Sequence, residues 1–187
     1  AVAVVVQLPL WAEALRCLKC RLAASRSHVV FGSGPQHPVV LVVGESPGQE
    51  EDHSGKPFAG DAGLLLDKML ASIGLSREAN TYLATIVKCR PPMNRDPAPD
   101  EQNACMHFLT RQMAALKPKA ILALGRIPSQ ALLKTRDGIA KLRATVWNYN
   151  GIPLVATYHP NALLREETLK RPAWEDLKLL KSVLSDG

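Results

Sequence analysis

Three features are absent from the 187-residue sequence: a long apolar run, a phosphate-binding glycine motif and any cysteine beyond four. No apolar run approaches the roughly 20 residues that a helix needs to cross a bilayer, so we expect no membrane partner. Neither G-x-G-x-x-G nor a P-loop with its lysine occurs, which argues against a dinucleotide or triphosphate cradle. The opening segment AVAVVVQLPLW lacks a basic leader and a small-residue cleavage site, and we therefore expect no secretory signal.

The chain also lacks internal repeats, low-complexity segments and any linker that would separate two domains. Its length and its hydrophobic content of 47% fit one globular domain with a full-sized core. We therefore predict a single domain over residues 1–187 that acts as a monomer. Without an export signal, we expect a cytoplasmic, reducing location. The net charge of +6 permits a polyanionic partner.

The four cysteines that are present predict a metal site. Cys17 and Cys20 form a C-x-x-C pair that can chelate from one turn, whereas the fold must bring Cys89 and Cys105 to them. Four thiolates are what a tetrathiolate metal or iron–sulfur site requires, and a reducing compartment disfavours disulfides. The alternatives are two disulfides or four unrelated buried thiols, because free cysteine is often a small core residue.

Strand and helix patterns alternate along the chain. Continuous apolar runs that suit strands buried on both faces occupy residues 38–43, 81–88, 119–125 and 153–158. Helical spacing, caps and helix breakers predict helices over residues 9–20, 62–74, 101–116, 127–134 and 173–184. The first of these helices would carry Cys17 and Cys20. Helices between buried strands imply an α/β fold with a central four-stranded parallel sheet and helices on both faces.

Each predicted strand runs into an unusual polar loop. The four loops are rich in glycine or proline and read GESPGQEED, KCRPPMNRDP, LGRIPSQ and HPNALLR. In open parallel sheets, ligands bind at the carboxyl ends of the strands. We therefore expect the four loops to converge on one site.

Three side chains in or near these loops could bind a ligand or take part in a reaction. Glu45 suits the positioning of a water or the stabilisation of a developing cation, although the acidic run at residues 50–52 could be only a solvated loop. Phe58 lies in GKPFAGDAG and could stack on a planar ligand or anchor the loop to the sheet. His159 precedes Pro160, a rigid residue that would aim its ring, although a lone histidine is usually structural.

The last loop also carries two leucines beside a cation. Leu163 and Leu164 next to Arg165 look like a wedge that enters a base stack while the arginine meets a phosphate. The alternative is that both leucines begin the buried face of the next helix.

Together, several ordered motifs closely resemble the iron–sulfur uracil-DNA glycosylases, the fourth family of the uracil-DNA glycosylase superfamily. The resemblance rests on GESPGQEEDHSGKPFAGDAGLLL, TIVKCRPPMNRDP, TYHPNALLR and the order of the four cysteines, and it extends from Cys17 to Glu175. It implies a DNA-repair hydrolase that flips uracil out of single- or double-stranded DNA, cleaves its N-glycosidic bond and leaves an abasic site. It also implies that Cys17, Cys20, Cys89 and Cys105 bind a [4Fe–4S] cluster.

The resemblance gives roles to individual residues. Glu45 and His159 would be catalytic, through the hydrolytic water and the leaving uracil respectively. The base would contact five residues: Gly44, Ser46, Phe58, Thr85 and Asn161. DNA would contact five others: Arg90, Arg95, Leu163, Leu164 and Arg165.

The sequence departs from the family pattern at three of these positions. Ser46 stands where alanine or glycine is usual, and Asn161 stands where serine is common. Thr85 replaces an asparagine whose amide reads the uracil edge, and one hydroxyl offers fewer hydrogen bonds than an amide. Two alternatives therefore stay open: an iron–sulfur DNA-binding member with weakened catalysis or altered specificity, and an α/β enzyme on a small nucleotide or nucleoside with a structural zinc.

Overall fold

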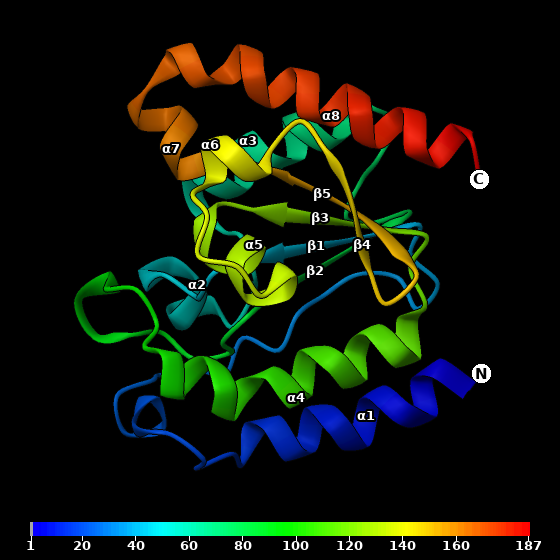
Figure 1. Cartoon of the computed structure of the whole chain (residues 1–187). Helices are drawn as coiled ribbons and strands as arrows, with labels where there is room; N and C mark the ends of the chain where they lie inside the picture. Colours follow the sequence, from blue (N-terminus) through cyan, green and yellow to red (C-terminus); the bar gives the residue numbers. More distant parts are fainter. Residues whose placement is uncertain (1) are drawn as a thin grey trace.

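Five strands form one sheet in the order β2-β1-β3-β5-β4 (Figure 1). The computed structural model describes the backbone of residues 2–187 and the side chains of residues 8–187. The strands are β1 (Val40–Gly44), β2 (Thr81–Thr85), β3 (Ala120–Leu124), β4 (Val146–Tyr149) and β5 (Ile152–Thr157). All residues of β1, β2 and β3 are buried, as expected for parallel strands covered on both faces.

The expected four-stranded sheet was one strand short. Four strands pair in parallel as predicted, and β4 adds a fifth, antiparallel strand at the edge beside β5. Asn150 and Gly151 form the tight connection between β4 and β5, with φ angles of 48° and 89°. Positive φ at both central residues is the geometry that an Asn-Gly hairpin turn requires. The strand has only four residues and only half-buried inward side chains, so it lacks the apolar run by which the other strands were recognised.

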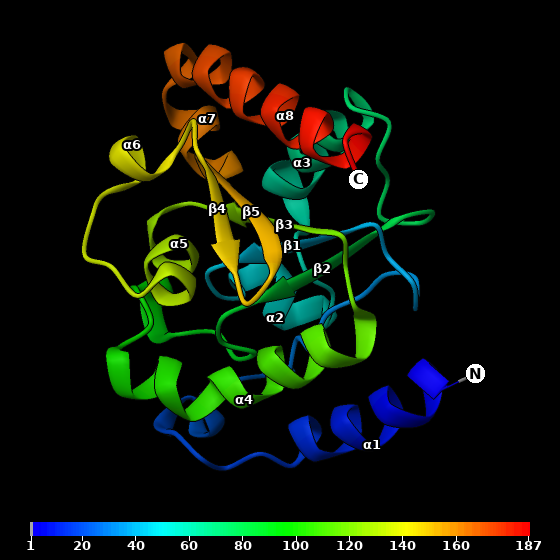
Figure 2. The ribbon, with the colours of Figure 1, turned by 45° about the vertical axis from the view of Figure 1, so that its right-hand side comes forward.

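Helices cover both faces of the sheet (Figures 1 and 2). One core cluster joins the sheet to α1 (Val2–Leu15), α4 (Pro99–Leu116) and α5 (Arg126–Leu133). The other joins it to α3 (Gly60–Ala71), α7 (Pro160–Arg165) and α8 (Lys170–Ser185). Shorter helices lie in the connections: η1 (Arg21–Ala24), α2 (Gln49–Ser54), η2 (Pro92–Asn94), α6 (Ile139–Leu142) and η3 (Glu167–Leu169).

The first helix ends earlier than expected. Helix α1 stops at Leu15, so Cys17 and Cys20 lie in the following loop and not on a cysteine-bearing helix. The amides of Arg16 and Cys17 already bond three residues back instead of four, which tightens the chain into a turn. The α1 side chains that face α4 include Leu10 and Ala14, each 1% exposed.

The described part of the chain includes no helix that has both the length and the apolar character needed to span a membrane. Helix α1 lies against α4 as an outer layer in both ribbon views.

Candidate active site and metal centre

A large pocket lies at the carboxyl ends of the parallel strands, where α2, α7 and the loop containing η2 meet (left in Figure 1). Its volume is about 670 Å³. Strand β1 lies between β2 and β3, so the chain passes from β1 to β2 on one side and then crosses back to β3 on the other side. Such a switch point opens a crevice in which α/β proteins bind ligands. The pocket is lined by eight of the expected site residues: Glu45, Ser46, Phe58, Thr85, His159, Asn161, Leu164 and Arg165.

Gly44 allows an aromatic ring to close the floor of this pocket. It ends β1, and a methyl group at this position would collide with the tip of the Phe58 ring. Phe58 itself has a left-handed backbone, with φ of 49°, and its side chain is only 6% exposed. The ring is therefore a loop anchor that also forms part of the pocket wall, and its stacking on a planar ligand stays a prediction.

Arg77 holds the Phe58 loop in place. Its guanidinium donates to the carbonyl oxygens of Pro57 at 3.2 Å and Phe58 at 3.0 Å. The same side chain donates to Asp67 of α3 at 2.7 Å. A fixed guanidinium that satisfies two loop carbonyls offsets the strain of a left-handed phenylalanine.

His159 faces the Phe58 ring and has a defined tautomer. The two rings are stacked, with centroids 6.0 Å apart and an angle of 27° between their planes. The backbone N–H of Asn161 donates to Nδ1 of His159 at 3.0 Å, so Nδ1 is an acceptor. Burial, with a smaller effect of Arg165, lowers the pKa of His159 to about 4. The imidazole is therefore neutral at pH 7 and carries its proton on Nε2, where it can donate.

Glu45 shares the pocket with a second carboxylate that the sequence analysis did not single out. Asp96, from the loop after β2, also lines the pocket and accepts a hydrogen bond of 2.6 Å from Arg126, the first residue of α5. Burial, followed by the charge and a hydrogen bond of Asp96, raises the pKa of Glu45 to about 7, and Arg126 acts in the opposite direction. A carboxyl group with this pKa can gain or lose a proton at neutral pH.

The acidic run after GESPG is more structural than expected. Glu51 accepts from the amides of Gly48 and Ala59, both at 3.2 Å, and so ties the two pocket loops together. Asp52 is 5% exposed and accepts from the amides of Ser27 at 2.8 Å and His28 at 3.2 Å. Two of the three acidic residues therefore position backbone, and the reading of the whole run as a solvated loop is wrong.

Thr85 ends β2 opposite Gly44 in the parallel register and lies in the pocket wall. Its side chain is buried, and its hydroxyl donates to the carbonyl oxygen of Val87 at 2.7 Å. A hydroxyl has one proton, so Oγ1 can only accept from a ligand while this bond holds.

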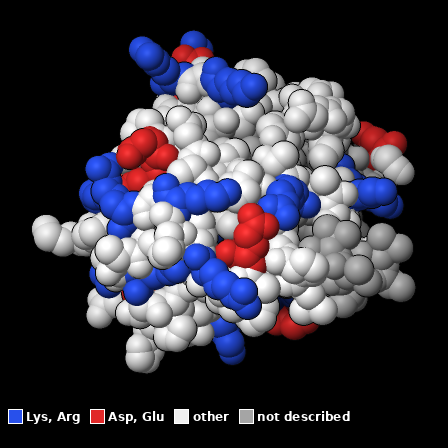
Figure 3. All heavy atoms as spheres, turned by 90° about the horizontal axis from the view of Figure 1, so that it is seen from below, with Lys and Arg blue, Asp and Glu red and all other residues white. Residues whose placement is uncertain are grey.

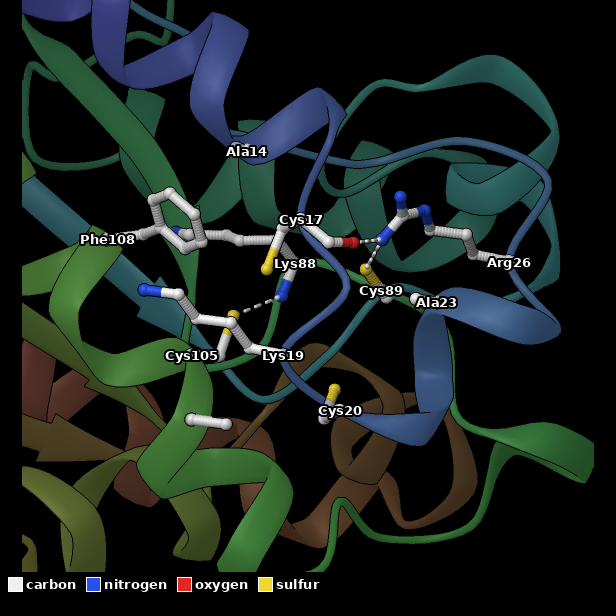
Figure 4. A pocket seen from close by; sticks show the side chains of 11 residues that line it. Ala14, Cys17, Lys19, Cys20, Ala23, Arg26, Lys88, Cys89, Cys105 and Phe108 are labelled. Atoms are coloured by element: carbon white, nitrogen blue, oxygen red, sulfur yellow. Dashed lines mark hydrogen bonds between the residues drawn. The ribbon is translucent and has the colours of Figure 1, made fainter.

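The four cysteines surround one cavity (Figure 4). Cys17 and Cys20 come from the loop after α1, Cys89 from the segment after β2, and Cys105 from α4. All four are free thiols, so the two-disulfide alternative is wrong in this structure. Among the described residues, no three cysteine, histidine or carboxylate side chains lie close enough together to hold a single metal ion. Four cysteines round one cavity are the ligand number that a tetrathiolate zinc site or an iron–sulfur cluster requires.

Two cationic residues flank the four sulfur atoms. Arg26 donates to Sγ of Cys89 at 3.4 Å and to the carbonyl oxygen of Cys17 at 2.8 Å. The backbone N–H of Lys88 donates to Sγ of Cys105 at 3.3 Å (Figure 4). Burial raises the pKa of the Cys105 thiol to about 11, and the smaller effect of Lys88 acts in the opposite direction. N–H groups aimed at sulfur are the outer contacts that orient cluster ligands.

Arg95 and Arg90, both expected to contact DNA, have different partners within the protein. Both Nη atoms of Arg95 donate to buried Glu101, at 2.9 and 2.6 Å, and this carboxylate also accepts from Arg21 at 2.8 Å. Arg95 therefore fastens its loop to α4, and its contact with a phosphate stays a prediction. Arg90 donates through Nε to Asn94 at 2.8 Å, and its contact with DNA stays a prediction. Figure 3 shows the face that α1 and α4 form, with basic side chains gathered over its left half and middle.

The two leucines of the last loop have opposite environments. Leu163 is 2% exposed and belongs to the core that α3 and α8 share with the sheet. It is therefore a packing residue, and the expected wedge role for it is wrong. Leu164 is 50% exposed and lines the pocket next to Arg165.

Sequence reasoning missed Asp96, Arg77 and Lys88. Asp96 could have been found, because the loop KCRPPMNRDP follows a strand whose carboxyl end was expected to face the site. Arg77 carries no such signal, since it lies in a loop after α3 and reaches the site only through its long side chain.

Comparison with known proteins shows the family of the chain. Residues 31–178 match the family model of the uracil DNA glycosylase superfamily. A type-4 uracil-DNA glycosylase of Thermotoga maritima is 41% identical over 176 residues, which cover 90% of this chain and 90% of that protein. Another from Saccharolobus solfataricus is 40% identical over 182 residues, with 92% of this chain and 84% of that protein covered. One from Archaeoglobus fulgidus is 38% identical over 174 residues, or 89% and 87% of the two chains. The chain belongs to the uracil-DNA glycosylase superfamily, as a member of its type-4 family.

Proposed function

We propose that this protein excises uracil from DNA by hydrolysing the N-glycosidic bond and leaves an abasic site. The observation that carries this proposal is the neutral imidazole of His159, which accepts at Nδ1 and donates at Nε2 beside a stacking ring. A departing uracil takes negative charge on its ring oxygens, and a fixed donor stabilises that charge as it grows. Membership of the type-4 family supports the same substrate.

Base binding would begin with extrusion of the nucleotide, because its C1′ atom is hidden in the stacked duplex. The flipped base would lie on the Phe58 ring, with Gly44 providing the space for that ring. Thr85 would accept a hydrogen bond from the base edge through Oγ1. Stacking is the sequence-tolerant part of this recognition, and the hydrogen bond is the part that distinguishes bases.

Bond cleavage would use the two sides of the pocket. His159 Nε2–H would donate to uracil O2 as the base departs, while the sugar becomes oxocarbenium-like. Glu45 in its ionised form would hold the attacking water on the opposite side. Asp96 and Arg126 would set the proton affinity of Glu45, because their opposed charges act on it from the neighbouring loops.

The cofactor that we propose is a [4Fe–4S] cluster held by Cys17, Cys20, Cys89 and Cys105. Its contribution when bound would be to join three separate segments of the chain by metal–thiolate bonds. Arg26 and the Lys88 amide would orient the ligands through their contacts with sulfur. The segment after β2 would thereby be held at the edge of the base pocket.

Contact with the DNA duplex would come from the rim of the pocket. Leu164 is the exposed apolar side chain of the last loop, and Arg165 beside it is also exposed. An apolar wedge that enters a base step, with a cation on the adjacent phosphate, helps to keep a nucleotide extruded. Arg90 and the basic side chains of the face in Figure 3 would add contacts with the backbone.

The test is single-turnover uracil excision by native protein and two histidine variants. His159→Ala should lower the rate by about 10²–10³ while affinity for DNA changes little, as for loss of one donor to a developing anion. His37→Ala is the matched control, because His37 is exposed and lies before β1, away from the pocket. An unchanged rate for His159→Ala would remove the donor role from this residue.

A further inference from the structure

Lys88 is the largest fully buried side chain of the protein among the described residues, with 1% exposure. Its ammonium donates to the carbonyl oxygen of Thr85 at 2.9 Å and lies 6.0 Å from the centre of the Phe31 ring. Among the described side chains, no carboxylate pairs with it. Burial of an ammonium without a negative partner is costly, so the charge of Lys88 needs a counter-ion that these contacts do not supply.

The cavity of the four cysteines provides that counter-ion. Lys88 lines this cavity, its backbone N–H donates to Sγ of Cys105 at 3.3 Å, and it directly precedes Cys89 in the chain. A [4Fe–4S] core with four thiolates carries a net negative charge in a buried site, where electrostatic interactions are strong. Arg26 contacts the same cavity from a half-buried position on its other side. The cavity therefore has buried Lys88 in its lining and the half-buried guanidinium of Arg26 beside a sulfur atom.

The side chain of Lys88 also contacts a residue of the base-pocket wall. The carbonyl oxygen that its ammonium holds belongs to Thr85, the last residue of β2, whose hydroxyl lies in the pocket wall. The Thr85 hydroxyl in turn donates to Val87, so residues 85–88 form a closed set of hydrogen bonds. One residue thus contacts a cysteine of the cluster cavity through its backbone amide and Thr85 of the base-pocket wall through its side chain.

We propose that Lys88 is the buried counter-ion of the iron–sulfur cluster and that its ammonium positions the end of β2 in the base pocket. Lys88 is a positioning residue, since it acts on the base through Thr85. The inference rests on the proposed cofactor and goes beyond it, because it gives one side chain a role in both cavities.

The test uses cluster-loaded protein and three variants. Lys88→Met removes the charge and the hydrogen bond at similar volume. Lys88→Gln removes the charge and retains a donor for the Thr85 carbonyl. Lys19→Met is the matched control, because Lys19 lines the same cavity but is exposed. The readouts are the midpoint potential of the cluster by voltammetry and the single-turnover rate of uracil excision at saturating DNA.

A buried cation favours the more negative, reduced cluster, so its removal lowers the potential. We expect both Lys88 variants to lower the equilibrium constant for one-electron reduction about tenfold, or about 59 mV. Lys19→Met should change that constant less than about threefold, because solvent screens an exposed charge. Lys88→Met should also slow excision about tenfold, whereas Lys88→Gln should retain most of the rate because its amide still donates.

Different outcomes separate the parts of the proposal. A Lys88→Met or Lys88→Gln potential equal to that of Lys19→Met would overturn the counter-ion role. A lowered potential with an unchanged rate of excision in Lys88→Met would overturn the positioning role. Colourless native protein with stoichiometric zinc would instead overturn the cofactor on which the inference rests, while native uracil excision would still support the proposed function.

Discussion

The two cavities of this protein are built from different kinds of side chain. The pocket at the carboxyl ends of the strands is wide and lined by polar and charged groups such as Glu45, Asp96 and His159. The cavity of the cysteines lies between α4 and the loop after α1, and alkyl and aromatic side chains such as Ala14 and Phe108 surround its sulfur atoms. The first arrangement suits proton transfer and an exchangeable ligand, and the second suits a permanent group that connects segments.

A five-residue segment, Thr85–Cys89, belongs to both cavities. It begins in the wall of the pocket at the strand ends and ends at Cys89 of the cysteine cavity. The comparison therefore predicts two kinds of defect. Changes in the cysteine cavity should first affect folding, and changes in the base pocket should first affect rate, with Lys88 affecting both.

Loss of a cysteine should have the largest effect. Cys89→Ser is expected to remove the cluster and most of the folded protein, because metal binding contributes directly to folding free energy when the ligands come from separate segments. Iron content, visible absorption and circular dichroism measure this loss. Ser46→Ala in the base pocket is the control and should keep both the cluster and the fold. Normal stability of Cys89→Ser without iron would contradict a structural role of the metal centre.

Thr85→Asn should change the chemistry of the base pocket without affecting the metal centre. The hydroxyl proton of Thr85 is committed to Val87, so the native residue offers only an acceptor to the base. An asparagine amide could donate to uracil O4 and accept from N3–H, which should raise uracil excision by about one to two orders of magnitude and improve discrimination against cytosine. Single-turnover rates on U·G, U·A and C·G duplexes measure both effects. A variant no faster and no more selective would remove Thr85 from base recognition.

The pH dependence of excision should report Glu45. Its pKa is raised to about 7, so its carboxylate is lost as pH falls through that value. We expect the single-turnover rate to decrease about tenfold per pH unit below 7 and to level off above pH 8, since the ionised form holds the water. His159, with a pKa of about 4, titrates outside this window. Glu45→Gln should be slow and independent of pH from 6 to 8; retention of the pH-dependent limb in this variant would assign it to another group.

The neighbouring leucines provide the finest comparison. Leu164→Ala should leave stability unchanged and slow excision from duplex U·A several-fold more than from single-stranded DNA, because only the duplex must be unstacked. Leu163→Ala should instead cost about 2–5 kcal/mol of folding free energy, as for a buried leucine, with equal effects on both substrates. Thermal unfolding and paired excision assays separate the two. Equal losses on both substrates for Leu164→Ala would remove the wedge.

Much of this architecture could be predicted from sequence, because its signals are local. The apolar runs predicted four parallel strands, and the loops that follow them supplied most of the pocket residues. The fifth strand was also signalled, by Asn150-Gly151, but its short and half-exposed pattern was not recognised. Burial was harder to predict, since Leu163 and Leu164 are equivalent in sequence and differ only in which face of α7 meets the core.

The partners of charged side chains could not be predicted in the same way. Arg95 lies six residues before its carboxylate partner, yet only the start of α4 brings Glu101 back to it. Lys88 directly precedes Cys89 in the sequence, and the fold buries its side chain against the carbonyl oxygen of Thr85. Such contacts depend on tertiary packing, which a local pattern does not contain.

The most direct test of the whole account is base release by native, cluster-loaded protein from U·G, U·A, single-stranded uracil and C·G substrates under single-turnover conditions. Alkaline cleavage of the DNA would reveal each abasic site. The account predicts abasic sites at uracil in all three uracil substrates and slower release of cytosine from C·G. Folded, iron-containing protein that binds these DNAs and leaves no abasic site at uracil would contradict it.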